Sequence, residues 1–122
     1  MKLNFLFLLF MILFPGILYA ASISPNLTTF SQHDIFDHWI ETRCIGKAFN
    51  NSDITKDANI SAAAWLETSS LPVDAFNEAD KLIDAELKVK LSGSVEGNYN
   101  ILKCSLIANS KAAEKIFKTF SK

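Results

Sequence analysis

Histidine and carboxylate residues are concentrated in the segment HDIFDH, where they could support metal or acid–base chemistry. His33 and Asp37 are four residues apart, and so are Asp34 and His38, so a helix would place each pair on one face. Imidazole and carboxylate ligands of this kind could hold zinc for a metal-dependent hydrolase, with Glu41 as a further ligand. The alternative is that the carboxylates stabilise the first turns of a helix and the histidines are exposed. The spacing matches no zinc signature, so we expect no metal ligands and no cofactor.

Nucleophilic catalysis has weaker support. The only cysteines are Cys44 and Cys104, and we expect them to bind each other, which leaves no thiolate. The segment GSVEG does not match the nucleophile elbow that a catalytic serine requires. We therefore predict no catalytic residue and conclude that the protein is not an enzyme.

The N-terminus has the pattern of a secretory signal peptide at residues 1–20. Lys2 precedes an apolar run, Pro15 and Gly16 interrupt that run, and small residues follow, so cleavage after Ala20 or Ser22 fits equally well. The alternative is a membrane anchor, but the run is shorter than the roughly 20 apolar residues that a spanning helix needs. We expect a disordered or extended leader at residues 21–29 and one domain at residues 30–122.

Export gives the two cysteines a structural meaning. In an oxidising compartment they are expected to form a disulfide between residues about 60 positions apart. The alternative is two buried free thiols.

Helical periodicity accounts for nearly all of the remaining chain, and no segment alternates as a strand would. We predict an all-α bundle of about five helices. Their expected ranges are 30–50, beginning with a capping pattern at Ser31; 52–68, capped by Ser52; 70–91, capped by Ser70; 99–108; and 110–120, capped by Ser110. The apolar side of the fourth helix is predicted to consist of Ile101, Leu102, Cys104 and Leu106.

A polar stretch framed by two glycines separates the third and fourth predicted helices. It consists of Ser92, Gly93, Ser94, Val95, Glu96, Gly97 and Asn98. We expect the glycines to supply the positive φ angles of a tight turn, and a polar loop on a rigid scaffold suits partner binding. The alternative is an ordinary helix stop, which explains Gly93 but requires neither Gly97 nor the apolar Val95.

The charge balance excludes a strongly basic protein. Without Lys2 the chain holds 11 basic and 13 acidic residues, a net charge of about −2. Nucleic acid is therefore not an expected partner, and neither is a membrane after signal cleavage. An acidic face on the third helix (Asp74, Glu78, Asp80, Asp84) could steer a basic partner, or could simply be solvated.

Four segments in order carry a resemblance to a known family: RCIGKAF, DANISAAAWLE, LPVDAFNEADKLID and SVEGNYNILKC. Over about residues 33–120 the chain resembles the periplasmic immunity proteins that bacteria make against type VI secretion amidase effectors, specifically the fourth amidase-effector family. The resemblance implies an all-helical homodimer in the periplasm. It also implies a partner: a Cys-His amidase that cleaves the D-glutamyl–diaminopimelate bond of peptidoglycan.

The resemblance assigns roles to particular residues. A family loop between two late helices blocks the amidase cleft, and residues 92–98 occupy the matching place. The family disulfide matches Cys44 and Cys104.

The runner-up interpretation of the sequence is a secreted helical carrier of a small apolar ligand. It would need a cavity of roughly several hundred Å³ lined by Phe and Ile.

Overall fold

A computed structural model describes residues 26–122 of the chain, so the predicted signal peptide and most of the predicted leader lie outside the described residues. Five α-helices follow one short 3-10 helix, and residues 26–122 contain no strand, which confirms the predicted all-α class. No helix in this range is both long and apolar enough to span a membrane. The elements are η1 (Leu27–Thr29), α1 (Gln32–Ala48), α2 (Ser52–Thr68), α3 (Val73–Glu86), α4 (Asn100–Ala108) and α5 (Lys111–Phe120).

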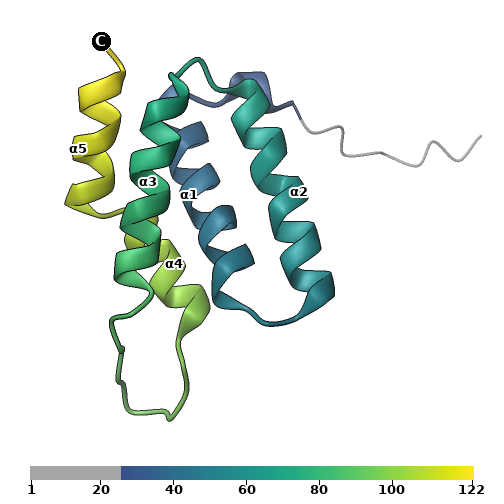
Figure 1. The fold of residues 1–122 in the computed structure, drawn as a ribbon, viewed down its shortest axis with the longest axis vertical. Coiled ribbons are helices and arrows are strands. Elements are labelled where there is room, and N and C mark those ends of the chain that lie inside the picture. The colour runs from purple at the N-terminus through teal and green to yellow at the C-terminus, as the bar shows by residue number, and fades with distance from the viewer. Residues whose placement is uncertain (1–25) are drawn as a thin grey trace, which may run out of the picture.

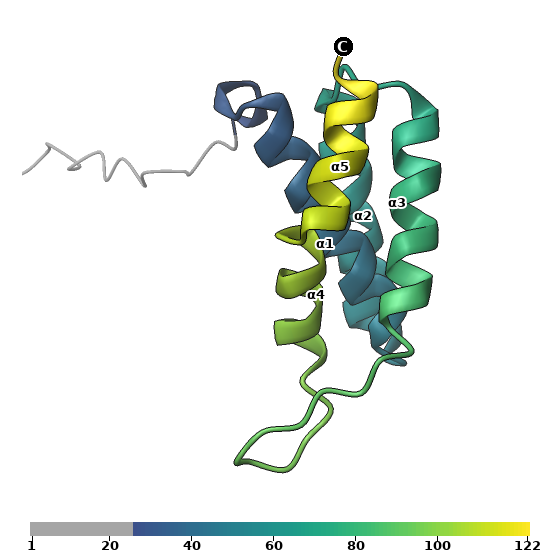
Figure 2. The ribbon, with the colours of Figure 1, turned by 90° about the vertical axis from the view of Figure 1, so that its left-hand side faces the viewer.

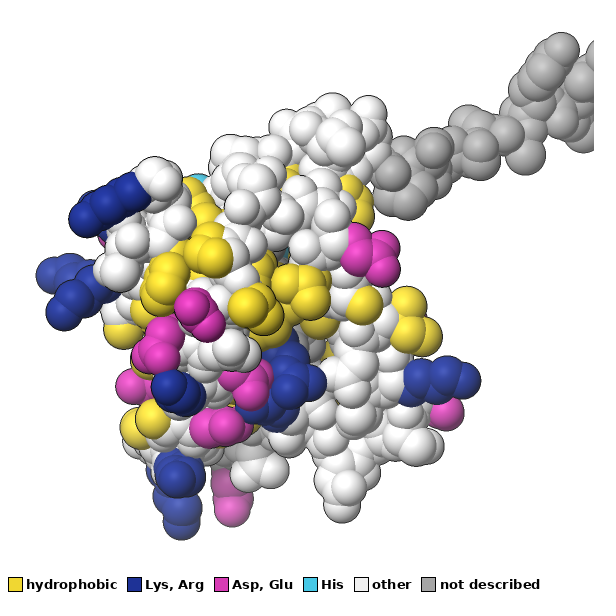
Figure 3. Space-filling view, turned by 45° about the horizontal axis from the view of Figure 1, so that its top comes forward, with side chains coloured by type: hydrophobic (Ala, Val, Ile, Leu, Met, Phe, Trp, Pro, Cys, Tyr) yellow, Lys and Arg dark blue, Asp and Glu magenta, His cyan; other side chains and the backbone are white. Residues whose placement is uncertain are grey.

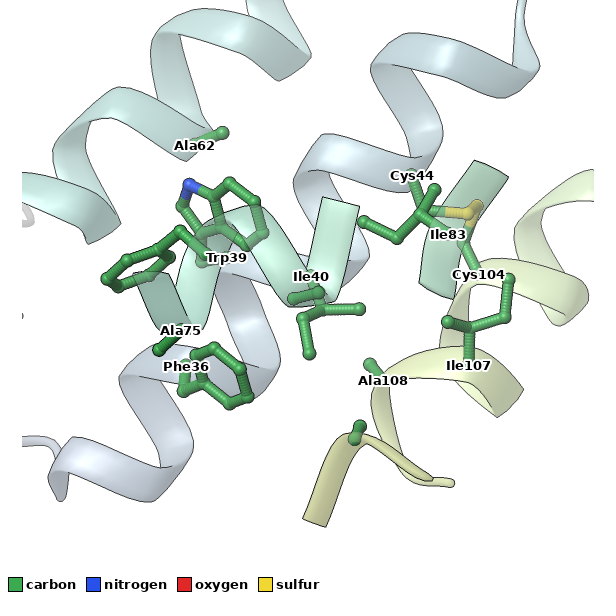
Figure 4. Packing of buried hydrophobic residues seen from close by; sticks show 13 residues of the cluster. Phe36, Trp39, Ile40, Cys44, Ala62, Ala75, Ile83, Cys104, Ile107 and Ala108 are labelled. Carbon is green, nitrogen blue, oxygen red and sulfur yellow. A yellow bond between two sulfur atoms is a disulfide. The ribbon is translucent and has the colours of Figure 1, made fainter. Parts of the chain in front are cut away.

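Helix α1 is the centre of the bundle and contacts each of the other four α-helices. Helix α2 lies along one side of it, and α3, α4 and α5 cover the other side (Figures 1 and 2). The apolar side of α1 is buried, with Phe36, Ile40 and Cys44 fully inaccessible to solvent. These side chains belong to one buried cluster that also includes Ile83 of α3 and Ile107 of α4 (Figure 4).

The starts of four helices were predicted from capping residues, and two of those predictions are confirmed. The Ser31 and Ser110 hydroxyls accept hydrogen bonds from the backbone N–H groups of residues 34 and 113, at 3.0 and 3.1 Å. For α2 the predicted cap is wrong, because the Asn51 carboxamide oxygen accepts the bonds of the first turn and Ser52 is already helical. For α3 it is also wrong: Pro72 stands at the cap position in an extended conformation, so the helix begins after it.

Helix α3 is shorter than predicted, ending at Glu86 instead of near Leu91. Backbone bonds from residues 88 and 89 reach back three positions instead of four, which tightens and ends the last turn. The ammonium of Lys103 lies 3.4 Å from the Leu87 carbonyl oxygen, where a cation favours a helix C-terminus. A tertiary contact from α4 therefore stabilises this end.

The predicted disulfide is present between Cys44 of α1 and Cys104 of α4, with 2.07 Å between the sulfur atoms. It sets the rotation of α4: Lys103, Cys104, Ile107 and Ala108 face inward. The predicted apolar side of this helix is therefore wrong except at Cys104. The other three predicted residues, Ile101, Leu102 and Leu106, are each about half exposed.

The end of the predicted leader has some regular structure. Residues 27–29, expected to be disordered or extended, form the single turn η1. The reason is local, because the side-chain oxygen of Asn26 accepts from both the backbone N–H and the hydroxyl of Thr28.

Candidate functional site

The two histidines of the HDIFDH segment lie in separate surroundings. His33 Nε2 is 3.6 Å from Asp37 Oδ2, and the His33 ring stacks on Phe117 of α5. The ring of His38 instead stacks on Trp65 of α2. Among residues 26–122, no three side chains of His, Cys, Asp or Glu are arranged to hold a metal ion. The described structure thus does not bring the proposed zinc ligands together.

Asp37 is a partly buried carboxyl group of this region with a raised pKa. Burial raises its pKa above the ordinary value, although the neighbouring His33 works in the opposite direction. One of its carboxylate oxygens is buried without a hydrogen-bond partner. An unpaired buried oxygen costs stability, and the hollow beside Asp37 has a volume of only about 90 Å³. Asp37 is therefore better explained as a local cost of packing α1 against α5.

The segment that connects α3 to α4 leaves the helical body. Figures 1 and 2 show this α3–α4 loop (residues 87–99) extending beyond the ends of both helices and returning. All seven residues of the predicted binding stretch, residues 92–98, are exposed, and we call this stretch the tip segment. Val95 has 71% of its surface exposed, which leaves its apolar side chain free to contact a partner.

Both ends of the loop are fastened to the helical body by residues of α4. The Lys103 ammonium contacts the Leu87 carbonyl at the start of the loop. Asn100 follows the loop directly, and its side-chain nitrogen donates to the Ala48 carbonyl at the end of α1, 3.3 Å away. Cys104 then fixes α4 to α1 through the disulfide. The projecting loop thus rests on a firmly held base.

The backbone of the loop corrects the expected role of its glycines. Neither Gly93 nor Gly97 has a positive φ angle. The left-handed residue is Tyr99, with φ 54° and ψ 32°, and it precedes the first turn of α4. Its hydroxyl donates a hydrogen bond to the Val95 carbonyl. Sequence reasoning overlooked this residue, and because tyrosine disfavours positive φ, no sequence signal pointed to it.

The acidic face of α3 is largely paired within the chain. Asp80 accepts from Arg43 and Lys47 of α1 at 2.8 and 2.7 Å. Partial burial works to raise the pKa of Asp80, but the hydrogen bonds from these two cations outweigh it, so the pKa lies below its ordinary value. In Figure 3 basic side chains stand among the acidic ones on this face. The pairing weakens the idea that this face steers a basic partner.

The hollows between the helices are open at the surface. One, of about 190 Å³, lies between α4 and the end of α3 and is lined by Val89, Leu91, Leu106 and Ile107 together with Lys103. Another, of about 340 Å³, runs between α2 and α3 over Trp39 and Phe76 (Figure 3). Neither is the enclosed Phe- and Ile-lined chamber that an apolar carrier requires.

Comparison with known proteins gives a consistent result. Residues 34–117 match the profile of Tai4, described as type VI secretion system (T6SS) amidase immunity protein. One similar solved structure is the effector Tae4 from Salmonella typhimurium in complex with the immunity Tai4 from Enterobacter cloacae. The match has 47% identity and a TM-score of 0.74, and it covers 78% of this chain and 98% of the matched chain.

Two further complexes agree with that match. The Tae4–Tai4 effector–immunity complex from Enterobacter cloacae also gives 47% identity and a TM-score of 0.74, over 78% of this chain and 97% of the matched one. The Tae4/Tai4 system from Salmonella typhimurium, in its selenomethionine variant, is 24% identical with a TM-score of 0.71. It covers 78% of this chain and 95% of the matched one, and it supports the fold alone. A search of curated proteins found no match.

Proposed function

This chain belongs to the Tai4 family of type VI secretion system amidase immunity proteins, and we propose that it inhibits a peptidoglycan amidase effector by inserting the α3–α4 loop into the active-site cleft. The family match and the relatives in effector–immunity complexes support binding to an amidase. The proposal needs no chemistry from this chain. It acts by occupying the enzyme, one immunity protein site for each active site.

The observation that carries the loop mechanism is the projection of the tip segment. Seven consecutive exposed residues extend away from a helical body that offers no comparable protrusion within residues 26–122 (Figure 2). An active-site cleft is concave, so the element that blocks it must be convex and narrow. The tip segment has that shape.

Val95 and Glu96 are the side chains with the most to contribute at the tip. Val95 can bury its exposed apolar surface in the cleft, and burial of apolar area favours association. Glu96 is also exposed, and it can occupy the place of a carboxylate of the peptide substrate. The tip would then imitate the acidic peptide on which a peptidoglycan amidase acts.

An inhibition assay tests this mechanism. The probe enzymes are the Tae4 effectors of Salmonella typhimurium and Enterobacter cloacae, assayed on purified peptidoglycan with and without the immunity protein. We expect Val95→Ala, Glu96→Ala and the double variant to weaken inhibition, the double variant by about tenfold or more, since buried anchor residues dominate interfaces.

A matched control separates the loop from the rest of the surface. Ile60 and Glu67 are an exposed apolar and an exposed acidic residue on α2, and their double alanine variant should inhibit as the wild type does. If the wild type inhibits neither effector, the assignment to these enzymes is wrong. If it inhibits but the Val95/Glu96 variant is equally potent, the loop mechanism is wrong.

We also propose a homodimer that forms through the outer face of α4. Ile101, Leu102 and Leu106 expose 55%, 49% and 53% of their surfaces on this face, beside the half-exposed Val89. Contiguous apolar surface of this kind marks interaction sites. A second copy is the occupant we propose, because two such faces can pack against each other about a twofold axis.

Sedimentation of the purified protein tests the dimer. Leu102→Glu should yield a monomer, whereas Ile60→Glu on α2, a residue with 60% exposure, should leave the mass unchanged. An unaltered dimer in the Leu102→Glu variant would place the interface elsewhere.

Export to the periplasm is the last element of the proposal. Residues 1–20 carry the sequence pattern of a signal peptide, and the disulfide fits an oxidising compartment. Periplasmic extracts should contain a protein whose intact mass corresponds to cleavage after Ala20 or Ser22. An uncleaved chain in the membrane fraction would contradict cleavage, and a chain confined to the cytoplasmic fraction would contradict export.

A further inference from the structure

Tyr99 stands in a backbone conformation that its side chain disfavours. Its φ of 54° is the single positive φ angle among the residues of the described range that are not glycine. For a bulky residue this is a true outlier, and such strain persists only where the surrounding structure holds it. At the cap position of α4 its side chain makes no hydrogen bond to the helix. The side chain of Tyr99 therefore does not cap α4.

The left-handed turn aims the tyrosine back into the loop. Its hydroxyl donates to the Val95 carbonyl at the tip. Its ring also lies against Gly93 on the outgoing arm, where an added Cβ would stand 2.6 Å from Oη and 3.0 Å from Cζ. One side chain thus joins the tip and both arms of the loop, and Gly93 is glycine because a side chain there would collide with the ring.

No other hydrogen bond reaches this part of the loop. Within the described range 26–122, the bond from Tyr99 to Val95 is the only one that involves residues 90–98. Without it the loop would sample many conformations, and binding would have to order them. Ordering costs of this kind are subtracted from affinity, and prior rigidity removes them.

We propose that Tyr99 is a positioning residue that holds the α3–α4 loop in its projecting shape before the amidase binds. In this proposal, glycine at position 93 leaves the space that the ring of Tyr99 occupies. This inference rests on the proposed inhibitory function. It adds that part of the affinity comes from a residue outside the tip segment. It also explains why a strained tyrosine stands where asparagine would satisfy the backbone better.

The test combines three substitutions with one matched control. Tyr99→Phe removes the hydroxyl alone, and Tyr99→Asn replaces the ring with a residue that tolerates the left-handed region. Gly93→Ala fills the gap, and Gly97→Ala is the matched control for the order of the loop in the free protein, because an added Cβ at Gly97 meets nothing within 4 Å. Affinity for the two Tae4 effectors, amide hydrogen exchange of residues 90–98 and the melting temperature of the free protein are measured for each.

The expected pattern separates positioning from structural support. Tyr99→Phe should weaken binding about 3- to 10-fold, the usual range for one hydrogen bond, mainly through faster dissociation. Gly93→Ala and Tyr99→Asn should weaken it at least about tenfold, while Gly97→Ala leaves the exchange of residues 90–98 as in the wild type. Exchange of residues 90–98 should accelerate in the Tyr99 variants. The melting temperature should stay constant, or rise in Tyr99→Asn because the strain is relieved.

The two possible failures can be told apart. If a variant that replaces residues 94–96 with Gly-Ser-Gly still inhibits fully, the proposed loop function fails. If that variant loses inhibition while Tyr99→Phe, Tyr99→Asn and Gly93→Ala all bind as the wild type does, the positioning role alone is refuted. A fall in melting temperature that accounts for the whole loss of binding would also overturn it.

Discussion

The double substitution Cys44→Ala, Cys104→Ala is predicted to lower the free energy of unfolding by about 4 kcal/mol or somewhat more. The disulfide joins residues 60 positions apart in sequence, between the central helix α1 and the short helix α4. Its main effect is on the unfolded chain, because the covalent link forbids conformations in which these two residues are far apart.

The magnitude follows from the size of the closed loop. For a separation of 60 residues the chain-entropy relation gives about 14 cal/mol/K, or about 4 kcal/mol at 25 °C. Both cysteines are fully buried, so the alanine variant also loses sulfur contacts and leaves small cavities. The free energy of unfolding of a small domain is only about 5–15 kcal/mol, so this loss would be a large part of the total stability.

Urea unfolding followed by circular dichroism measures this change. The oxidised wild type, the wild type refolded in reductant and the double alanine variant are compared at 25 °C, with thiol titration to verify each redox state. The reduced wild type retains its sulfur atoms, so its difference from the oxidised form isolates the cross-link. Its m-value should also rise, because an unlinked chain exposes more surface on unfolding. A difference below about 1 kcal/mol between the oxidised and reduced forms would refute the reasoning.

Three further substitutions test the packing and electrostatics of the helical body. Asp80→Asn removes the acceptor of Arg43 and Lys47 and should cost about 1 kcal/mol at pH 7. Because the folded pKa of Asp80 is lowered, its contribution is lost as pH falls through that pKa, so the difference in urea midpoint should shrink in acid. Asp37→Asn should instead stabilise the folded protein at pH 7. Burial raises the pKa of Asp37, so the negative charge that this residue carries at pH 7 destabilises the wild type. The gain, measured by thermal unfolding, should vanish in acid, where the wild-type carboxyl is protonated. Ile83→Ala, at a fully buried site, should cost about 2–5 kcal/mol in the same urea assay.

The fold was predicted well where one face of a helix has a continuous stripe of apolar residues. In α1, apolar residues at four-residue steps all turn inward, because a long helix with one apolar stripe has a single good way to pack. The serine caps of α1 and α5 were found for a similar reason. A cap depends on residues only three positions apart, so local sequence contains nearly all of the information.

Helix α4 could not be oriented from its sequence. It has nine residues with Ile101, Leu102, Leu106 and Ile107 spread around its axis, so the apolar pattern indicates no direction. The disulfide at Cys104 decides which side turns inward, and it buries Lys103 in the process. The end of α3 was misjudged for a comparable reason. No residue between 87 and 91 breaks a helix, and the contact that favours the end comes from α4.

The exposure of the α3–α4 loop was predicted from the sequence, but its internal structure was not. Two glycines and the polar residues between them mark a loop by local chemistry, and residues 92–98 are exposed as expected. The backbone conformation inside the loop differs from the one expected from the sequence. Positive φ was expected at glycine and occurs at Tyr99, because a contact to Val95 compensates for the strain. Such compensation depends on the three-dimensional structure, which composition and spacing do not describe.

Neighbouring residues of α4 link the disulfide to the proposed function of the loop. Lys103 contacts the Leu87 carbonyl where the loop begins, and Cys104 fixes α4 to α1 where the loop ends. If α4 shifted, both ends of the loop would move with it. The disulfide therefore positions the loop as well as stabilising the domain, and the two effects can be distinguished. At temperatures below the melting range of every variant, reduction of the disulfide should weaken amidase binding more than the substitution Ile83→Ala does. The reason is that Ile83 belongs to α3 and forms no covalent bond to α4. Equal losses of binding would mean that the disulfide acts through global stability alone.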